Sequence, residues 1–133
     1  MDKEWNVLVV SSLMHRRKYL LNTFQGFPIH PFVVSTSQQA REMLSSLSFA
    51  LVFCEETTAD GSYRELLSEV RATSTETRFV VMLSTSEWEG YLGALRLGVT
   101  DAIPSPLQST DIESILLHAI RGDSGEGSLR ATA

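Results

Sequence analysis

The sequence predicts an α/β fold: a three-layer sandwich in which a doubly wound (βα)5 chain forms a parallel sheet in the strand order 2-1-3-4-5. Five short apolar runs, rich in Val, Ile and Phe, have the length of strands: residues 7–10, 32–34, 51–54, 79–83 and 99–103. A segment of helical periodicity follows each run. Connections that contain a helix join parallel strands through right-handed crossovers.

The composition of the runs indicates their places in the sheet. Runs 7–10, 51–54 and 79–83 are continuously apolar, which is typical of strands covered on both faces. Pro28 and Pro31 precede run 32–34, and Asp101 lies within run 99–103. Since proline and charge are tolerated best at sheet edges, we expect these two strands there.

Four of the helices are predicted by apolar residues at positions i, i+3, i+4 and i+7, which place one stripe on one helix face. The segment 13–25 is less regular, because Arg17 interrupts its stripe. Four serines are expected to precede helices as N-caps, and two glycines to end them. These residues are Ser35, Ser62, Ser86 and Ser109, with Gly26 and Gly98.

Composition limits the function. The chain has 133 residues, enough for one domain, and a net charge of −5, which does not favour nucleic-acid binding. It has one cysteine, Cys54, in an apolar run, and no signal-peptide or membrane-spanning pattern, so we expect a cytoplasmic protein without a membrane contact. The domain is predicted over residues 1–121, and the Gly- and Ser-rich residues 122–133 are expected to form a flexible tail or linker.

In an open parallel sheet, ligands bind beyond the carboxyl ends of the strands. The residues expected at that edge are mostly hydroxyl-bearing or acidic. They are Ser11, Ser12, Glu55, Glu56, Ser84, Thr85, Pro104, Ser105 and Pro106.

Four stretches, "NVLVVSS", "ALVFCEE" followed by "DG", "FVVMLSTS" and "LGVTDAIPSPL", occur in an order that resembles receiver domains of bacterial two-component response regulators. The resemblance covers residues 6–121 and implies the flavodoxin-like, CheY-like fold. It also implies a phosphoacceptor pocket at the carboxyl edge of the sheet.

The pocket departs from the family's pattern. Ser11 and Ser12 stand where receivers carry an acidic pair that holds Mg²⁺, and Glu55 stands at the phosphoacceptor Asp. Ser84 keeps the family's hydroxyl, Ser105 replaces a Lys before Pro106, and Ala102 replaces an aromatic switch residue. Mg²⁺ prefers several hard oxygen ligands. We therefore expect weak or absent Mg²⁺ binding, no cofactor, and no enzymatic activity.

Two features of this pocket carry further expectations. The Glu55 carboxylate either reaches the Ser84 hydroxyl, imitating a phosphorylated state, or is a solvated acid next to Glu56. The Ser105–Pro106 peptide bond is predicted to be cis, as is common in receivers.

Outside the pocket, the basic run "HRRK" at residues 15–18 is interpreted as a solvated helix face. No His, Cys or acidic residues show the spacing of metal ligands. Trp88 and Tyr91 are either an interface anchor on a helix weakened by Gly90 and Gly93, or part of the core.

The sequence thus predicts a degenerate receiver, or pseudo-receiver, that signals through a protein partner or a tethered output domain. A homodimer through the fourth helix, fifth strand and fifth helix is one form of this contact. Two alternatives stay open. One is a conventional receiver in which Glu55 or a nearby hydroxyl accepts phosphate. The other is a small-molecule sensor that uses the neutral pocket of Ser11, Ser12, Ser84 and Ser105.

Overall fold

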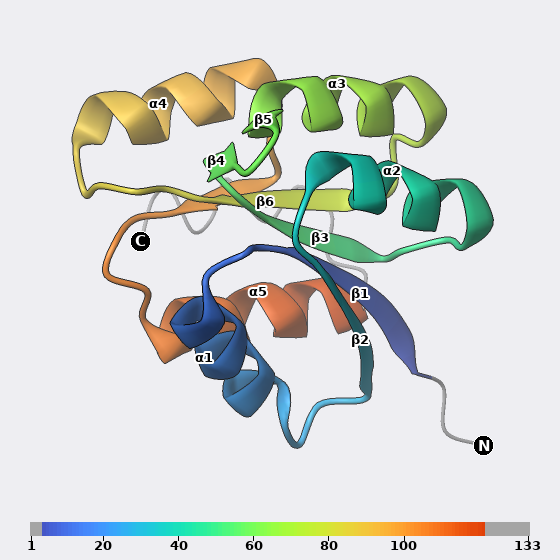
Figure 1. Cartoon of the computed structure of the whole chain (residues 1–133). Coiled ribbons are helices and arrows are strands. Elements are labelled where there is room, and N and C mark those ends of the chain that lie inside the picture. The colour runs from blue at the N-terminus through green and yellow to red at the C-terminus, as the bar shows by residue number, and fades with distance from the viewer. Residues whose placement is uncertain (1–3, 122–133) are drawn as a thin grey trace.

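A five-stranded parallel sheet forms the middle layer, in the order β2-β1-β3-β6-β7 (Figure 1). The computed structural model describes residues 4–121. The strands of this sheet are β1 (Trp5–Val10), β2 (Ile29–Val34), β3 (Leu51–Glu55), β6 (Arg78–Met82) and β7 (Asp101–Ile103). The order confirms the predicted 2-1-3-4-5 topology, with β2 and β7 at the edges.

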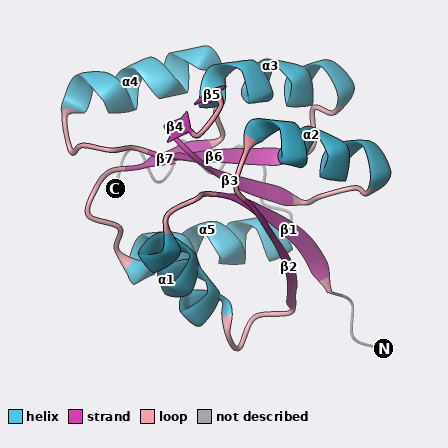
Figure 2. Cartoon of the chain, viewed as in Figure 1, coloured by secondary structure: helices cyan, strands magenta, loops and turns pink. Residues whose placement is uncertain are grey.

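Five helices cover the two faces of the sheet. They are α1 (Met14–Phe24), α2 (Ser37–Ser46), α3 (Tyr63–Thr73), α4 (Trp88–Leu97) and α5 (Ser109–Arg121). Helices α1 and α5 lie on one face, and α2, α3 and α4 lie on the other (Figure 2). The three-layer sandwich is therefore confirmed.

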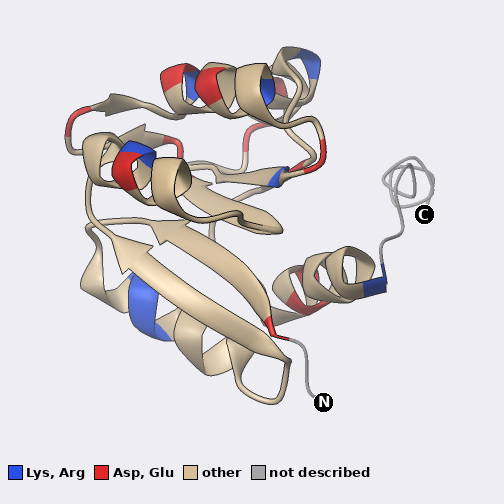
Figure 3. Ribbon diagram, turned by 90° about the vertical axis from the view of Figure 1, so that its right-hand side faces the viewer, with Lys and Arg blue, Asp and Glu red and all other residues tan. Residues whose placement is uncertain are grey.

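The side chains of the central strands alternate between two apolar clusters. Val7, Val9 and Phe53 belong to the cluster beneath α1 and α5, whereas Leu8 and Cys54 belong to the cluster beneath the other three helices. Charged residues lie mainly on the helices and loops, and the strands are mostly uncharged (Figure 3). Because both faces are covered, the sheet offers side chains to solvent mainly at its ends.

A short antiparallel hairpin, which the sequence analysis did not predict, lies between β3 and α3. Its strands are β4 (Thr57–Thr58) and β5 (Gly61–Ser62), and Thr58 pairs with Gly61 across a two-residue loop. The two loop residues are Ala59 and Asp60, and Gly61 follows them as the first residue of β5. Gly61 has a φ of 153°, a conformation that favours glycine.

The predicted helix caps are only partly confirmed. Ser62 caps α3, and Gly98, with a φ of 105°, ends α4. The prediction of Ser35 as an N-cap was wrong, because Thr36 forms the capping box of α2 with Gln39. Ser86 was also wrong, since Glu87 precedes α4 and its side chain makes no capping hydrogen bond within the described residues.

Two further boundaries differ by one or two residues. Ser109 is the first residue of α5 rather than the residue before it. Gly26, with a φ of 91°, follows Gln25, which is the C-cap of α1. The predicted tail, residues 122–133, lies outside the described residues. Within residues 4–121, none of the helices is both long and apolar enough to cross a membrane.

Candidate functional site

The end of β1 supplies Ser11 to the carboxyl edge of the sheet. Ser11 is buried, and its hydroxyl donates a hydrogen bond of 2.8 Å to Glu55 Oε2. Ser12, the next residue, is exposed. The two serines therefore do not form a paired ligand set, because only Ser11 contacts the carboxylate at the end of β3.

Glu55 is a buried acid with an exposed fraction of 6%. Its Oε1 lies 3.6 Å from Nη1 of Arg16, and its Oε2 accepts the Ser11 hydroxyl. Both interpretations from the sequence were therefore wrong. Glu55 is not solvated, and the carboxylate bound to the Ser84 hydroxyl is that of Glu56.

Strand alternation explains this correction. Glu55 is two residues after Phe53, so its side chain points to the face that α1 covers. Glu56 points to the opposite face, where its Oε1 accepts the Ser84 hydroxyl and the Ser84 backbone N–H, both at 2.9 Å. The period of two in the strand was the signal that could have assigned the partners of both acids.

Arg16 is the site residue that the sequence analysis missed. It is the third residue of α1, and its side chain is 13% exposed. Nη2 donates a 2.9 Å hydrogen bond to the Ser105 hydroxyl, while Nη1 faces Glu55. The Ser105 hydroxyl in turn donates to the Leu83 carbonyl at 2.6 Å. The guanidinium thus links α1 to the ends of β3 and β7.

Arg17 is also directed inward, so the basic run was not a wholly solvated face. Its Nε donates to the Ser11 carbonyl and its Nη2 to the Ser35 hydroxyl. His15 and Lys18 are exposed, as predicted. The Arg17 side chain thus links the β1–α1 connection to the β2–α2 connection by hydrogen bonds. This role explains why a charged residue stands in the apolar stripe of α1.

The residues at this edge do not fit a magnesium ion. Ser11 and Arg16 contact one carboxylate, that of Glu55, and one of its oxygens already accepts a hydrogen bond from the Ser11 hydroxyl. Mg²⁺ needs several hard oxygens in a near-octahedral array. A guanidinium 3.6 Å from the remaining oxygen repels a second cation. Within residues 4–121, moreover, His, Cys, Asp and Glu side chains form no cluster able to hold a metal.

The connection after β7 has the predicted backbone. The Ser105–Pro106 peptide bond is cis. Ala102, at the position of the family's switch aromatic, is buried with an exposed fraction of 5% and belongs to the cluster beneath α4. Because alanine has no side-chain rotamers, this position cannot change the surface by a rotamer change.

A cavity of about 850 Å³ lies beside Arg16 at the same edge. Ser84, Ser105 and Pro106 line it, and so does Tyr19 of α1. Ser11 and Ser12 are not among its lining residues, so the predicted four-serine pocket is only half present. Volumes of roughly 300–1,000 Å³ are usual for small-molecule sites.

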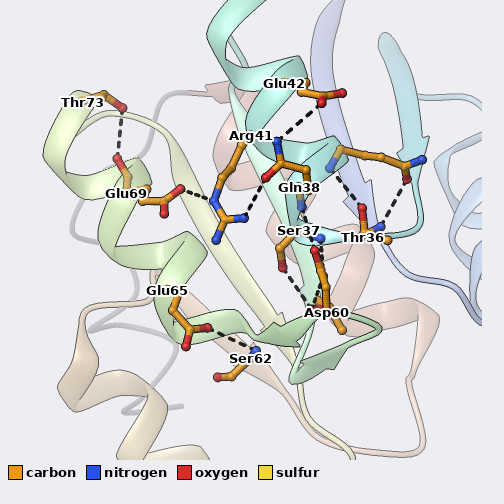
Figure 4. A network of polar contacts seen from close by, with 12 residues as sticks. Thr36, Ser37, Gln38, Arg41, Glu42, Asp60, Ser62, Glu65, Glu69 and Thr73 are labelled. Carbon is orange, nitrogen blue, oxygen red and sulfur yellow. Dashed lines mark hydrogen bonds and ion pairs between the residues drawn. The ribbon is translucent and has the colours of Figure 1, made fainter.

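The hairpin between β3 and α3 is bound to the start of α2 by Asp60. Its carboxylate accepts the backbone N–H groups of Ser37, at 2.8 Å, and Gln38, at 3.0 Å. Figure 4 shows Asp60 directed at these first residues of α2. Thr58 donates to Asp60 as well. These hydrogen bonds, above all that from Ser37, hold the pKa of Asp60 below its usual value.

Of the two aromatic residues on α4, Trp88 lies at the surface and Tyr91 packs partly into the core. Trp88 is 66% exposed, and its ring stacks on Tyr91 with 5.3 Å between centroids. Tyr91 is half-buried and packs against the core beneath α4. Core packing was therefore wrong for Trp88, while Tyr91 contributes to the core as expected.

No protein-family model matches the chain, and no curated protein matches its sequence. Solved structures do match. The signal receiver domain of a Luxo repressor protein from Vibrio parahaemolyticus is 16% identical, with a TM-score of 0.81 over 98% of this chain and 97% of that chain. A two-component response regulator from Clostridium difficile is 20% identical, with a TM-score of 0.80 over 89% and 97% of the two chains.

The receiver domain of a sensor histidine kinase from Pseudomonas aeruginosa, described with magnesium in its active site cleft, is 12% identical. Its TM-score is 0.77 over 89% of this chain and 98% of that chain. Identities this low establish a shared fold. The chain has the CheY-like fold of response regulator receiver domains.

Proposed function

We propose that this chain is a pseudo-receiver of a two-component signalling system, which acts through protein contacts and accepts no phosphoryl group. The fold shared with receiver domains supports the first part of the proposal. The contact between Glu55 and Arg16 carries the second part.

Phosphoryl transfer to a carboxylate depends on a free oxygen nucleophile and on cations that neutralise the transferred group. Glu55 has neither of its oxygens free of protein contacts, since Ser11 donates to one and Arg16 faces the other. Arg16 supplies a positive charge that is attached to the chain and does not need a bound ion. In this proposal, Arg16 neutralises the carboxylate of Glu55 as a metal ion would, and its contact keeps the carboxylate from acting as a nucleophile.

The proposal assigns no enzymatic activity and no cofactor to the chain. Its partner is another protein or a tethered output domain, and the exposed Trp88 on α4 supports a contact there. A homodimer through α4, β7 and α5 is the specific form that we propose, with no nucleic acid bound by this domain. The free, buried thiol of Cys54 supports a cytoplasmic location.

The test is the intact mass of the chain after incubation with Mg²⁺ and acetyl phosphate. The proposal predicts an unchanged mass for the wild type. An adduct of about 80 Da, one phosphoryl group, would overturn it in favour of the phospho-accepting alternative. Peptide mapping would then assign the adduct to Glu55 or to a hydroxyl such as Ser84.

The cavity beside Arg16 favours a second candidate function, the binding of a small molecule. Its wall combines the hydroxyls of Ser84 and Ser105 with the apolar surfaces of Tyr19 and Pro106. A thermal-shift screen with a metabolite library tests this candidate, because a bound ligand raises the melting temperature. A rise that Tyr19→Ala abolishes supports binding here, and a screen without any rise removes the candidate.

A further inference from the structure

Helix α4 has few features that stabilise it on its own. Ala94 is its only fully buried residue, and Gly90 and Gly93 lie within it. Each glycine costs about 1 kcal/mol of helix stability relative to alanine. Glu87 precedes the helix and makes no side-chain capping bond to the described residues. Beside the packing of Ala94, Tyr91 and Leu95 on the core, the connection that leads into α4 therefore helps to set its position.

Glu56 holds that connection at its second residue, Ser84. Its Oε1 accepts both the N–H and the hydroxyl of Ser84, each at 2.9 Å. The backbone of Glu56 is itself fixed, since its N–H donates to the Met82 carbonyl at 2.9 Å and its carbonyl accepts the Tyr63 N–H at 3.1 Å. The carboxylate is thus presented by a rigid segment between the end of β6 and the start of α3.

The other contacts of the β6–α4 connection are between neutral groups. The Leu83 N–H donates to the Ile103 carbonyl at 2.8 Å, and the Leu83 carbonyl accepts the Ser105 hydroxyl at 2.6 Å. The Thr85 carbonyl accepts the Ser105 N–H at 3.1 Å, and the Thr85 hydroxyl accepts the Glu87 N–H at 3.3 Å. Hydrogen bonds to an ionised carboxylate are roughly twice as strong as neutral ones. Among the contacts of the exposed part of this connection, which begins at Ser84, the pair made by Glu56 is the one that involves an ionised group.

We propose that Glu56 is a built-in ligand of the β6–α4 connection: its carboxylate holds Ser84 and thereby keeps α4, with the exposed Trp88–Tyr91 stack, in one position. Ala102 beneath α4 has no rotamers to change, so a rotamer change at that position does not move the helix. The inference goes beyond the proposed function, because it concerns how α4 is held in the unmodified chain and not whether Glu55 accepts a phosphoryl group.

Amide hydrogen exchange of the full chain, followed by mass spectrometry, tests this proposal. Glu56→Ala is expected to raise the exchange rates of amides in α4 by about tenfold, while peptides from α1 and α5 keep their rates. Ser84→Ala retains the backbone donor and is expected to give a smaller rise. Glu56→Gln retains an acceptor oxygen and is expected to give a rise between the wild type and Glu56→Ala.

Glu76→Ala is the matched control, because Glu76 is an exposed acid on the α3–β6 connection. It is expected to leave α4 exchange unchanged. A rise confined to α4 and its connection in Glu56→Ala supports the proposal. Unchanged exchange in α4, or the same rise in every helix, would overturn it. Neither result changes the mass measured after treatment with acetyl phosphate, so this proposal and the proposed function fail separately.

Discussion

The guanidinium of Arg16 and the carboxylate of Glu55 face each other at the carboxyl edge of the sheet, with 3.6 Å between Nη1 and Oε1. Both side chains are largely buried, and Nη1 has no hydrogen-bond partner within the described residues, so the contact is ionic. Burying either charge alone is costly, because the charge loses its contact with water and no opposite charge compensates for the lost solvation. The pair therefore makes each residue necessary to the other.

Removal of Arg16 is expected to destabilise the fold. Arg16→Ala leaves Glu55 buried with the Ser11 hydroxyl as its remaining partner, and breaking a buried pair in this way costs about 3–5 kcal/mol. The free energy of unfolding, measured with urea, checks this loss. Lys18→Ala on the exposed face of α1 is the control and is expected to change stability by less than about 0.5 kcal/mol.

A double variant separates charge from packing. Arg16→Met with Glu55→Gln removes both charges, and the amide still accepts the Ser11 hydroxyl. We expect it to recover about 1 kcal/mol or more relative to the sum of the single losses. Strictly additive losses would show that the two side chains act independently and that the ionic contact contributes nothing.

Asp60 is expected to give the fold a pH-dependent contribution. Its pKa is lower in the folded chain than in the unfolded one, so its carboxylate stabilises the fold above the unfolded value of 3.8. That contribution is lost as the pH falls through the lower, folded pKa. Asp60→Asn should therefore melt below the wild type at neutral pH, and the difference should shrink once the pH falls below the unfolded pKa.

Melting curves of the two proteins across this pH range provide the measurement. Glu76→Gln serves as the control, since Glu76 is exposed and its replacement should give the same small difference at every pH. If the melting difference between wild type and Asp60→Asn stayed constant down to strongly acidic pH, the hydrogen bonds from Ser37 and Gln38 would not be what stabilises the charged form.

Burial raises the pKa of the Cys54 thiol to about 12. The reactive thiolate is therefore scarce at neutral pH, and the sulfur is fully shielded in the cluster beneath α2, α3 and α4. A thiol-specific disulfide reagent should react with Cys54 only after denaturant unfolds the chain. Complete reaction within seconds in native buffer would contradict this burial.

The fold could be predicted from the sequence because its signals are local. Continuous apolar runs placed β1, β3 and β6 at the centre, and Pro28, Pro31 and Asp101 indicated the edges. The cis bond before Pro106 followed from the resemblance of one short stretch. Cap positions erred by one residue at Ser35 and Ser86: Thr36, a neighbouring hydroxyl residue, caps α2, and Glu87 precedes α4 without a capping side-chain bond.

The site was less predictable, because its contacts depend on long side chains that reach across elements. A run of charges such as residues 15–18 does not reveal that Arg16 and Arg17 turn inward while His15 and Lys18 stay exposed. Glu56, and not Glu55, binds the Ser84 hydroxyl, because strand alternation directs these two acids to opposite faces of the sheet. Applying that alternation past the end of β3 would have assigned Glu55 to the face of α1.

The central claim is that the Arg16 guanidinium stands in place of a metal ion, and titration of the full chain with Mg²⁺ tests it most directly. Isothermal calorimetry of the wild type should show no saturable binding at millimolar Mg²⁺, and the melting temperature should not change. Saturable Mg²⁺ binding by the wild type, abolished by Glu55→Gln and kept by Glu76→Gln, would contradict the account.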